Sequence, residues 1–391
     1  MHFGVERLAV RVSVNRLWLA IAVCVFASFA GPAAGEGPAG ISADADRTAM
    51  AVEALSRLQG VDLNQNPKLK EAVVKLLEKT RGTGQFVKLV RQFKLADQNP
   101  ALLELAIENP ANETGVEAIR WILANKDFSL LQEALTKTNA ASASKVAEAL
   151  GNTGQKEAVP LLLAVVTSEH GSPSVRKQAV QALARTSDGA AALLKLAREE
   201  KLSDELKFVA RSELNGVRWP EIRAEAATVL PLPRTQNAQP LPPVADLVNM
   251  KGDPSNGQKV FSSPTVGCAN CHQIKGVGID FGPNLSEVGS KLGKDALYEA
   301  ILEPSAGISF GFEAWQLQLK SGNEAYGLIV SETPDEVAVK AVGGIVSHYS
   351  KSEIVGREQM KLSLMPLGLQ QAMTTQELVD LVEYLSSLKK N

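Results

Sequence analysis

The first half of the sequence contains an internal repeat. ALGNTGQKEAVPLLL at 149–163 aligns with ALARTSDGAAALLKL at 182–196, an offset of 33 residues. Apolar residues at three- and four-residue spacing on either side of a polar turn predict a helical hairpin in both copies. Such a hairpin cannot bury its apolar face alone, so repeated copies stack. We therefore expect an α-solenoid over 44–229, with an irregular helical bundle as the alternative.

Charge and composition favour packed helices and argue against a nucleic-acid or anionic-membrane partner. The 41 basic and 43 acidic residues nearly cancel, and the sequence contains no basic stripe. Binding to nucleic acid or to an anionic membrane depends on clustered basic charge, so neither partner is expected. Aromatic residues make up only 5% of the sequence, which favours closely packed helices over a large sheet.

The first 35 residues predict an export signal. Three arginines precede an uncharged apolar stretch at 17–29, and small residues follow it. This stretch is shorter than the roughly 20 residues that a spanning helix needs, so we expect a cleaved signal peptide over 1–35; the alternative is an uncleaved anchor. The mature protein is then expected to be periplasmic or otherwise exported, without a transmembrane segment.

A proline-rich segment separates the helical half from the remainder. Five prolines lie among polar residues at 231–243. Proline cannot continue a helix, and it stiffens an extended spacer. We therefore predict a linker over 230–250 and a separate domain over 251–391.

The second domain contains the two cysteines that remain after signal removal. Cys268 and Cys271 are separated by two residues, and His272 follows directly. The Cys-x-x-Cys-His pattern attaches haem: both thiols add to its vinyl groups, and the histidine binds the iron. A zinc site needs about four ligands, and a thioredoxin-like pair needs a βαβ context. The sequence therefore predicts one covalently bound haem c, with His272 as the proximal iron ligand.

Three methionines near the C-terminus are candidates for the second axial ligand: Met360, Met365 and Met373. Met365 lies in SLMPLGL, a segment that Pro366 holds extended just before the last predicted helix. This position makes Met365 the expected distal ligand, with His348 as the alternative. A thioether ligand favours ferrous iron and raises the reduction potential, as suits an electron carrier.

The region ahead of this methionine segment has strand character. Alternating apolar and polar residues are separated by turn signals rich in Gly, Pro, Asn and Asp. The predicted strands are 315–322, 325–331 and 336–342, with a fourth strand region at 345–355. We expect a small antiparallel β insert at about 312–356.

The haem motif and its surroundings resemble the cytochrome c family. In that family a proline such as the one in GPNL at 282–285 braces the proximal histidine. The resemblance implies that the Pro283 carbonyl accepts the ring N–H of His272 and that Leu285 packs on the haem. It also implies that the first and last helices of the domain cross closely at Gly257.

Two finer resemblances concern the second domain and one helical segment. Residues 252–389 resemble the haem-binding domain of the Pirellula/Verrucomicrobium type found in planctomycetes, and SPSVRKQAVQAL at 172–183 resembles HEAT-like repeats. The motifs shared with the planctomycete-type domain are Cys-x-x-Cys-His, GPNL, EPS at 303–305, SLMPLGL at 363–369 and DLVEYL at 380–385.

The expected architecture is mainly α: a HEAT-like α-solenoid followed by a cytochrome c-like all-α haem domain that carries a small antiparallel β insert. The expected function is that of an exported mono-haem c-type cytochrome, an electron carrier rather than an enzyme. The solenoid would dock a redox partner, which is a donor or acceptor dehydrogenase or oxidase. The alternatives are an electron-transfer subunit of a dehydrogenase complex, a haem-based redox or ligand sensor or scaffold, and a haem peroxidase if the sixth iron position is open.

Overall fold

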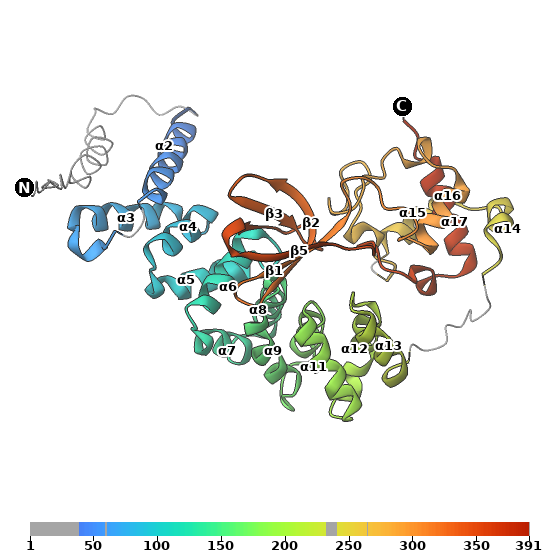
Figure 1. Cartoon of the computed structure of the whole chain (residues 1–391), viewed down its shortest axis with the longest axis horizontal. Helices are drawn as coiled ribbons and strands as arrows, with labels where there is room; N and C mark the ends of the chain where they lie inside the picture. Colours follow the sequence, from blue (N-terminus) through green and yellow to red (C-terminus); the bar gives the residue numbers. More distant parts are fainter. Residues whose placement is uncertain (1–38, 59–60, 232–240, 264, 391) are drawn as a thin grey trace, which may run out of the picture. The chain divides into compact units, whose positions relative to one another are not determined.

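The computed structural model describes residues 39–58, 61–231, 241–263 and 265–390 (Figure 1). It divides into two compact units, Met1–Leu95 and Ala96–Asn391. The predicted signal peptide lies outside the described residues, as do residues 232–240 of the predicted linker. The predicted domain boundaries stay predictions.

The described part of the first unit is helical. It contains α2 (Ala39–Ser56), η1 (Leu63–Gln65), α3 (Pro67–Thr80) and α4 (Gly84–Phe93). Pro67 begins α3, where its missing N–H would have no helical partner anyway. The Thr83 side chain accepts a hydrogen bond from the backbone N–H of Phe86 and caps α4. These caps divide the segment into short helices that pack on one another.

The second unit opens with a series of short helices. They are η2 (Ala96–Gln98), α5 (Asn99–Glu108), α6 (Glu113–Ala124), α7 (Phe128–Thr136), α8 (Ala140–Thr153), η3 (Lys156–Ala158), α9 (Val159–Val166), α10 (Pro173–Leu183), α11 (Ser187–Arg198), α12 (Asp204–Gly216) and α13 (Pro220–Val229). Side-chain caps at Asn112, Asp127, Asn139 and Thr186 start four of them. Helices two apart in the sequence pack on one another: α6 on α8, α8 on α10, and α10 on α12. This is the stacking expected of helical repeats.

A second group of helices begins inside the predicted linker, because its first helix spans Val244–Asn249. It comprises α14 (Val244–Asn249), α15 (Pro254–Ser262), η4 (Cys268–Asn270), η5 (Val288–Ser290), α16 (Lys294–Leu302), η7 (Leu369–Ala372) and α17 (Thr375–Ser387). They enclose one core of buried apolar side chains, to which α15, α16 and α17 contribute. Its largest fully buried side chain is Tyr298, whose hydroxyl donates to the Leu247 carbonyl at 3.2 Å.

Helices α15 and α17 cross in close contact, as the resemblance to the cytochrome c family implied. A Cβ on Gly257 would lie 2.0 Å from the backbone oxygen of Asp380, so no larger residue fits without a backbone shift. Phe261 and Tyr384 meet at the same crossing, with ring centroids 6.2 Å apart and ring planes tilted by 58°. Gly257 therefore sets how closely the first and last long helices of this domain approach.

A buried carboxylate reinforces the crossing. Asp380, 3% exposed, accepts hydrogen bonds from the Asp253 N–H, the Asn256 amide and the Gln376 amide at 2.7–2.8 Å. Burial by itself raises the pKa of Asp380, but these hydrogen bonds outweigh it and hold the pKa below its usual value. The ionised side chain therefore links the start of α15 to α17.

The expected all-α haem domain with a small β insert is wrong. Of the described residues, 58% are helical and 10% lie in strands. The strands form one antiparallel five-stranded sheet in the order β4-β3-β2-β1-β5. The strands are β1 (Ala314–Leu319), β2 (Glu324–Glu332), β3 (Glu336–Lys340), β4 (Val346–Ser350) and β5 (Ile354–Gln359). The sheet has its own apolar cluster of Leu317, Ala325, Val337 and Val339.

The error has a local cause at the predicted fourth strand region. A 3-10 turn, η6 (Lys351–Glu353), interrupts it, because the Ser350 side chain accepts from the Ser352 N–H. Beyond this turn the chain continues in the same direction as β5, which pairs antiparallel with β1 at the edge opposite β4. One expected strand is thus two strands at the two edges of the sheet.

Among the described residues, we find no helix with both the length and the apolar character needed to span a bilayer.

The close crossing predicts a large effect of one added methyl group. Gly257→Ala should lower the free energy of unfolding of the haem domain by about 2–3 kcal/mol, because the Cβ overlaps the Asp380 backbone. Denaturant unfolding would measure the loss. Gly307→Ala is the control, since its Cβ would meet no atom within 4 Å. Equal stability of the two variants would contradict the role given to Gly257.

Candidate haem site

The Cys-x-x-Cys-His segment forms one tight turn. Cys268 begins the short helix η4, and the backbone N–H groups of Cys271 and His272 donate to the Cys268 carbonyl at 3.1 and 3.0 Å. Both cysteines are partly buried, and their thiols are free. The turn therefore presents two thiols and an imidazole from five consecutive residues.

A backbone carbonyl fixes the ring of His272. Its Nδ1 lies 2.8 Å from the Pro283 oxygen. Because a carbonyl can only accept, Nδ1 carries the proton and Nε2 keeps its lone pair for a metal. Burial lowers the pKa of His272, and the bond to Pro283 opposes this only in part. The neutral, oriented ring is the form that ligates iron.

The following loop folds back onto the turn and holds Pro283 in place. The Phe281 and Gly282 N–H groups donate to the Cys271 carbonyl, and the Leu285 N–H donates to the Gln273 carbonyl at 2.9 Å. Gly282 packs on the imidazole itself: a Cβ there would lie 2.6 Å from His272 Cε1. The loop thus leaves space for the ring only because residue 282 has no side chain.

The two thiols differ from those of a redox-active pair. Burial raises the pKa of Cys268 to about 11, and burial also raises the pKa of Cys271. Catalytic Cys-x-x-Cys pairs instead have lowered thiol pKa values. In the part of the chain that the structure describes, no three His, Cys, Asp or Glu side chains converge as a metal site. The donor set fits thioether attachment of haem better than thiol–disulfide exchange or zinc.

Met365 packs against the same core as the attachment turn. It is partly buried against the apolar cluster that also contacts Cys268 and Leu285. Its N–H donates to the Ser363 hydroxyl at 3.1 Å, and the Ser363 N–H donates to the Ser305 hydroxyl at 3.1 Å. Two serines therefore fix the backbone of the methionine segment.

The other candidate ligands are placed differently. Met373 is 8% exposed and belongs to the apolar core itself. The Met360 N–H donates to the Ala314 carbonyl where β5 ends. His348 lies on β4 with Nδ1 2.6 Å from Glu336 and Nε2 3.5 Å from Glu113. Both of its ring nitrogens thus face carboxylates.

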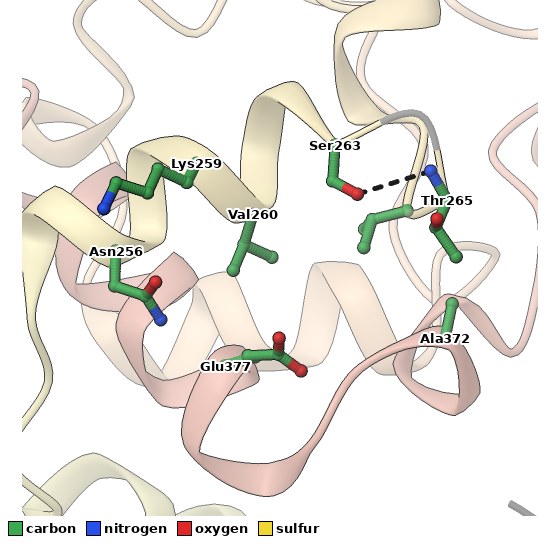
Figure 2. Close-up of a pocket in the computed structure, with 8 residues that line it drawn as sticks. Asn256, Lys259, Val260, Ser263, Thr265, Ala372 and Glu377 are labelled. Atoms are coloured by element: carbon green, nitrogen blue, oxygen red, sulfur yellow. Dashed lines mark hydrogen bonds between the residues drawn. The ribbon is translucent and has the colours of Figure 1, made fainter.

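A cavity of about 350 Å³ lies beside the turn, between α15 and the start of α17 (Figure 2). Its lining residues are Asn256, Lys259, Val260, Ser263, Thr265, Val266, Ala372 and Glu377. The Thr265 N–H donates to the Ser263 hydroxyl at its rim. None of the predicted haem-binding residues lines this cavity.

The residues present fit a covalently attached haem. The orientation of His272 Nε2, the space that Gly282 leaves beside the ring, and the Cys, Cys, His and Met donors are each what that group requires. Cys268, Cys271, His272, Pro283, Leu285 and Met365 would hold it.

Comparison with known proteins supports the same class. A family model of HEAT repeats matches residues 128–215, and a cytochrome c family model matches residues 254–328. The chain therefore carries HEAT repeats followed by a cytochrome c domain, and both predictions are confirmed. A search of curated proteins finds no match.

The cytochrome c match has limits along the chain. It includes the turn and Leu285 but ends before Met365. It is a match to cytochrome c in general, so the finer resemblance to the planctomycete-type domain stays a prediction.

Sequence reasoning missed several residues that shape the site. It treated GPNL as a proline and a leucine, although Gly282 lies against the ring. It noted the EPS segment without assigning Ser305 a contact, although Ser305 accepts from the methionine segment. A glycine just before the bracing proline, and serines in both segments, were the available signals.

The packing of residue 282 on the imidazole predicts a sensitive position. Gly282→Ala should displace the His272 ring and weaken its bond to Pro283. We expect about tenfold less holoprotein, the scale of loss when a partner that orients a metal-binding histidine is disturbed. Holoprotein yield and the electron paramagnetic resonance of the ferric haem would measure the change. Gly307→Ala is the control, and matching spectra and yields in both variants would contradict the packing argument.

Proposed function

We propose that this protein is an exported mono-haem c-type cytochrome that transfers single electrons between redox proteins. Cys268 and Cys271 form the thioethers, and His272 and Met365 bind the iron. The observation that carries the proposal is the His272–Pro283 hydrogen bond of 2.8 Å, which leaves Nε2 free within a Cys-x-x-Cys-His turn. The cytochrome c family match over 254–328 supports it.

When bound, the haem supplies a one-electron ferric/ferrous couple, which this part of the chain cannot provide by itself. The surrounding residues set its properties. Pro283 keeps the imidazole in one tautomer and raises its basicity. A thioether from Met365 favours the ferrous state. The apolar cluster against which Leu285 packs would limit the access of water to a bound haem.

The HEAT repeats would serve as the docking module for the redox partner, which we infer is a dehydrogenase or an oxidase. Stacked helical repeats offer extended binding surfaces for proteins. Export is inferred from the arginines and the apolar stretch of residues 1–35.

The first test concerns covalent attachment. Denatured full-length protein should retain one haem after acid–acetone extraction, because two thioethers anchor it. Cys271→Ala leaves one thioether at most, so its holoprotein yield should fall several-fold. Quantitation of the haem by its ferrous pyridine spectrum, per mole of protein, measures both.

Two controls accompany this test. Ser263 lies close to the attachment turn but outside it. Ser263→Ala should therefore retain the haem content of the wild type. A chain without residues 1–35 should carry no covalent haem if attachment follows export. Haem that extracts freely from the wild type would contradict the proposal.

The second test concerns the distal ligand and separates the rival functions. The ferric wild type should show the red-edge sulfur-to-iron charge-transfer band. Met365→Ala should lose that band and bind cyanide at least about a hundredfold faster, because the sixth position opens. Met360→Ala and Met373→Leu should keep the band. A wild type that lacks the band and binds cyanide at once would favour the peroxidase or ligand-sensor function instead.

A further inference from the structure

The sheet is joined to the helical repeats by a mostly buried charge. Arg120 on α6, 13% exposed, donates to the Tyr349 hydroxyl on β4 at 3.0 Å and to the Thr153 carbonyl. It also pairs with Glu117 at 2.7 Å. Burial by itself lowers the pKa of Arg120, but Tyr349 and Glu117 outweigh it and raise the pKa, so the guanidinium stays charged. A charge in this setting needs all of its acceptors.

The turn between β1 and β2 forms a second joint with the repeats. The Asn323 side chain, in a residue 8% exposed, accepts from the Lys156 N–H at 3.0 Å and donates to Glu157 at 3.2 Å. Arg218 lies over the Tyr326 ring and pairs with Glu324 at 3.2 Å.

The same sheet also contacts the loop that follows the attachment turn. Lys340, at the end of β3, donates to the Asp280 carbonyl at 2.9 Å and to its carboxylate at 3.0 Å. Asp280 lies three residues before Pro283, whose carbonyl orients His272. The sheet thus supports the loop on the proximal side.

On the distal side, the sheet leads directly into the methionine segment. The Met360 N–H donates to the Ala314 carbonyl on β1, which fixes the end of β5. In the segment that follows, the Ser363 N–H donates to the Ser305 hydroxyl and the Met365 N–H donates to the Ser363 hydroxyl. These two bonds hold the backbone at Met365. One sheet therefore contacts the repeats and both haem-binding loops.

We propose that the five-stranded sheet couples the helical repeats to the haem, so that its contacts with the repeats strengthen the bond between Met365 and iron. Tyr349 and Asn323 are then positioning residues for the distal ligand. The inference rests on the proposed function, because it requires a haem ligated by Met365. It gives the sheet a role beyond that of a passive insertion, and it makes events on the repeats detectable at the iron.

The test uses the full-length holoprotein in four forms. Tyr349→Phe combined with Asn323→Ala removes the hydrogen bonds of these two side chains with the repeats and keeps the aromatic ring of residue 349, while the Arg218–Glu324 pair stays in place. Ser305→Ala loosens the methionine segment directly and serves as the reference. Glu332→Gln is the matched control, because the ion pairs of Glu332 among the described residues are with Lys351 and Arg357, which belong to the sheet's own region. The fourth form is the wild type.

The readouts are the sulfur-to-iron band and the rate of cyanide binding to ferric protein. The double variant should bind cyanide roughly tenfold faster than the wild type, within the about 5–150-fold typical of coupling between sites. Glu332→Gln should stay within about twofold. A double variant as slow as Glu332→Gln, while Ser305→Ala is fast, would overturn the coupling.

Failure of the proposed function gives a different pattern. A wild type without covalent haem, or one that binds cyanide as fast as Met365→Ala, contradicts the ligand assignment and with it the coupling. If the wild type shows the band and Ser305→Ala binds cyanide fast, but the double variant binds cyanide as slowly as the wild type, the coupling alone is contradicted.

Discussion

The contact between α15 and α17 at Gly257 is the constraint on which the haem domain depends. The two helices come so close that the backbone of Asp380 occupies the space of any side chain at residue 257. The attachment turn follows α15, and the methionine segment precedes α17. One helix crossing therefore determines where both haem-binding segments leave the core. Asp380 adds polar bonds at the same place, and Phe261 and Tyr384 add an aromatic contact.

The five-stranded sheet connects the haem domain to the helical repeats. A small insertion would lie outside the haem domain and affect it little. The five-stranded sheet instead contacts α6 through Tyr349 and the HEAT repeats through Asn323, and it contacts the loop before Pro283 through Lys340. Its last strand ends at Gln359, six residues before Met365. A partner bound to the repeats would thus contact helices that the sheet connects to the loop before Pro283 and to the methionine segment.

Short-range chemistry was predictable from the sequence, and long-range pairing was not. The spacing of Cys268, Cys271 and His272 is a local property of one turn, and the helical repeat is a local periodicity. Strand β5 has an exposed, polar sequence, so no apolar alternation marked it. Arg120 and Tyr349 are 229 residues apart in the chain, and only the folded structure brings them together. The resemblance to cytochrome c implied the bond between His272 and Pro283; the role of Gly282 became visible only in the packing.

The most direct test of this account is the proton spectrum of the ferrous holoprotein with isotopically labelled methionine methyl groups. The haem ring current shifts the methyl group of an iron-bound methionine far from all the others. We predict one such resonance, which Met365→Leu abolishes and Met373→Leu leaves unchanged. A spectrum without a shifted methionine methyl, or one whose shifted resonance belongs to Met360 or Met373, would contradict the account.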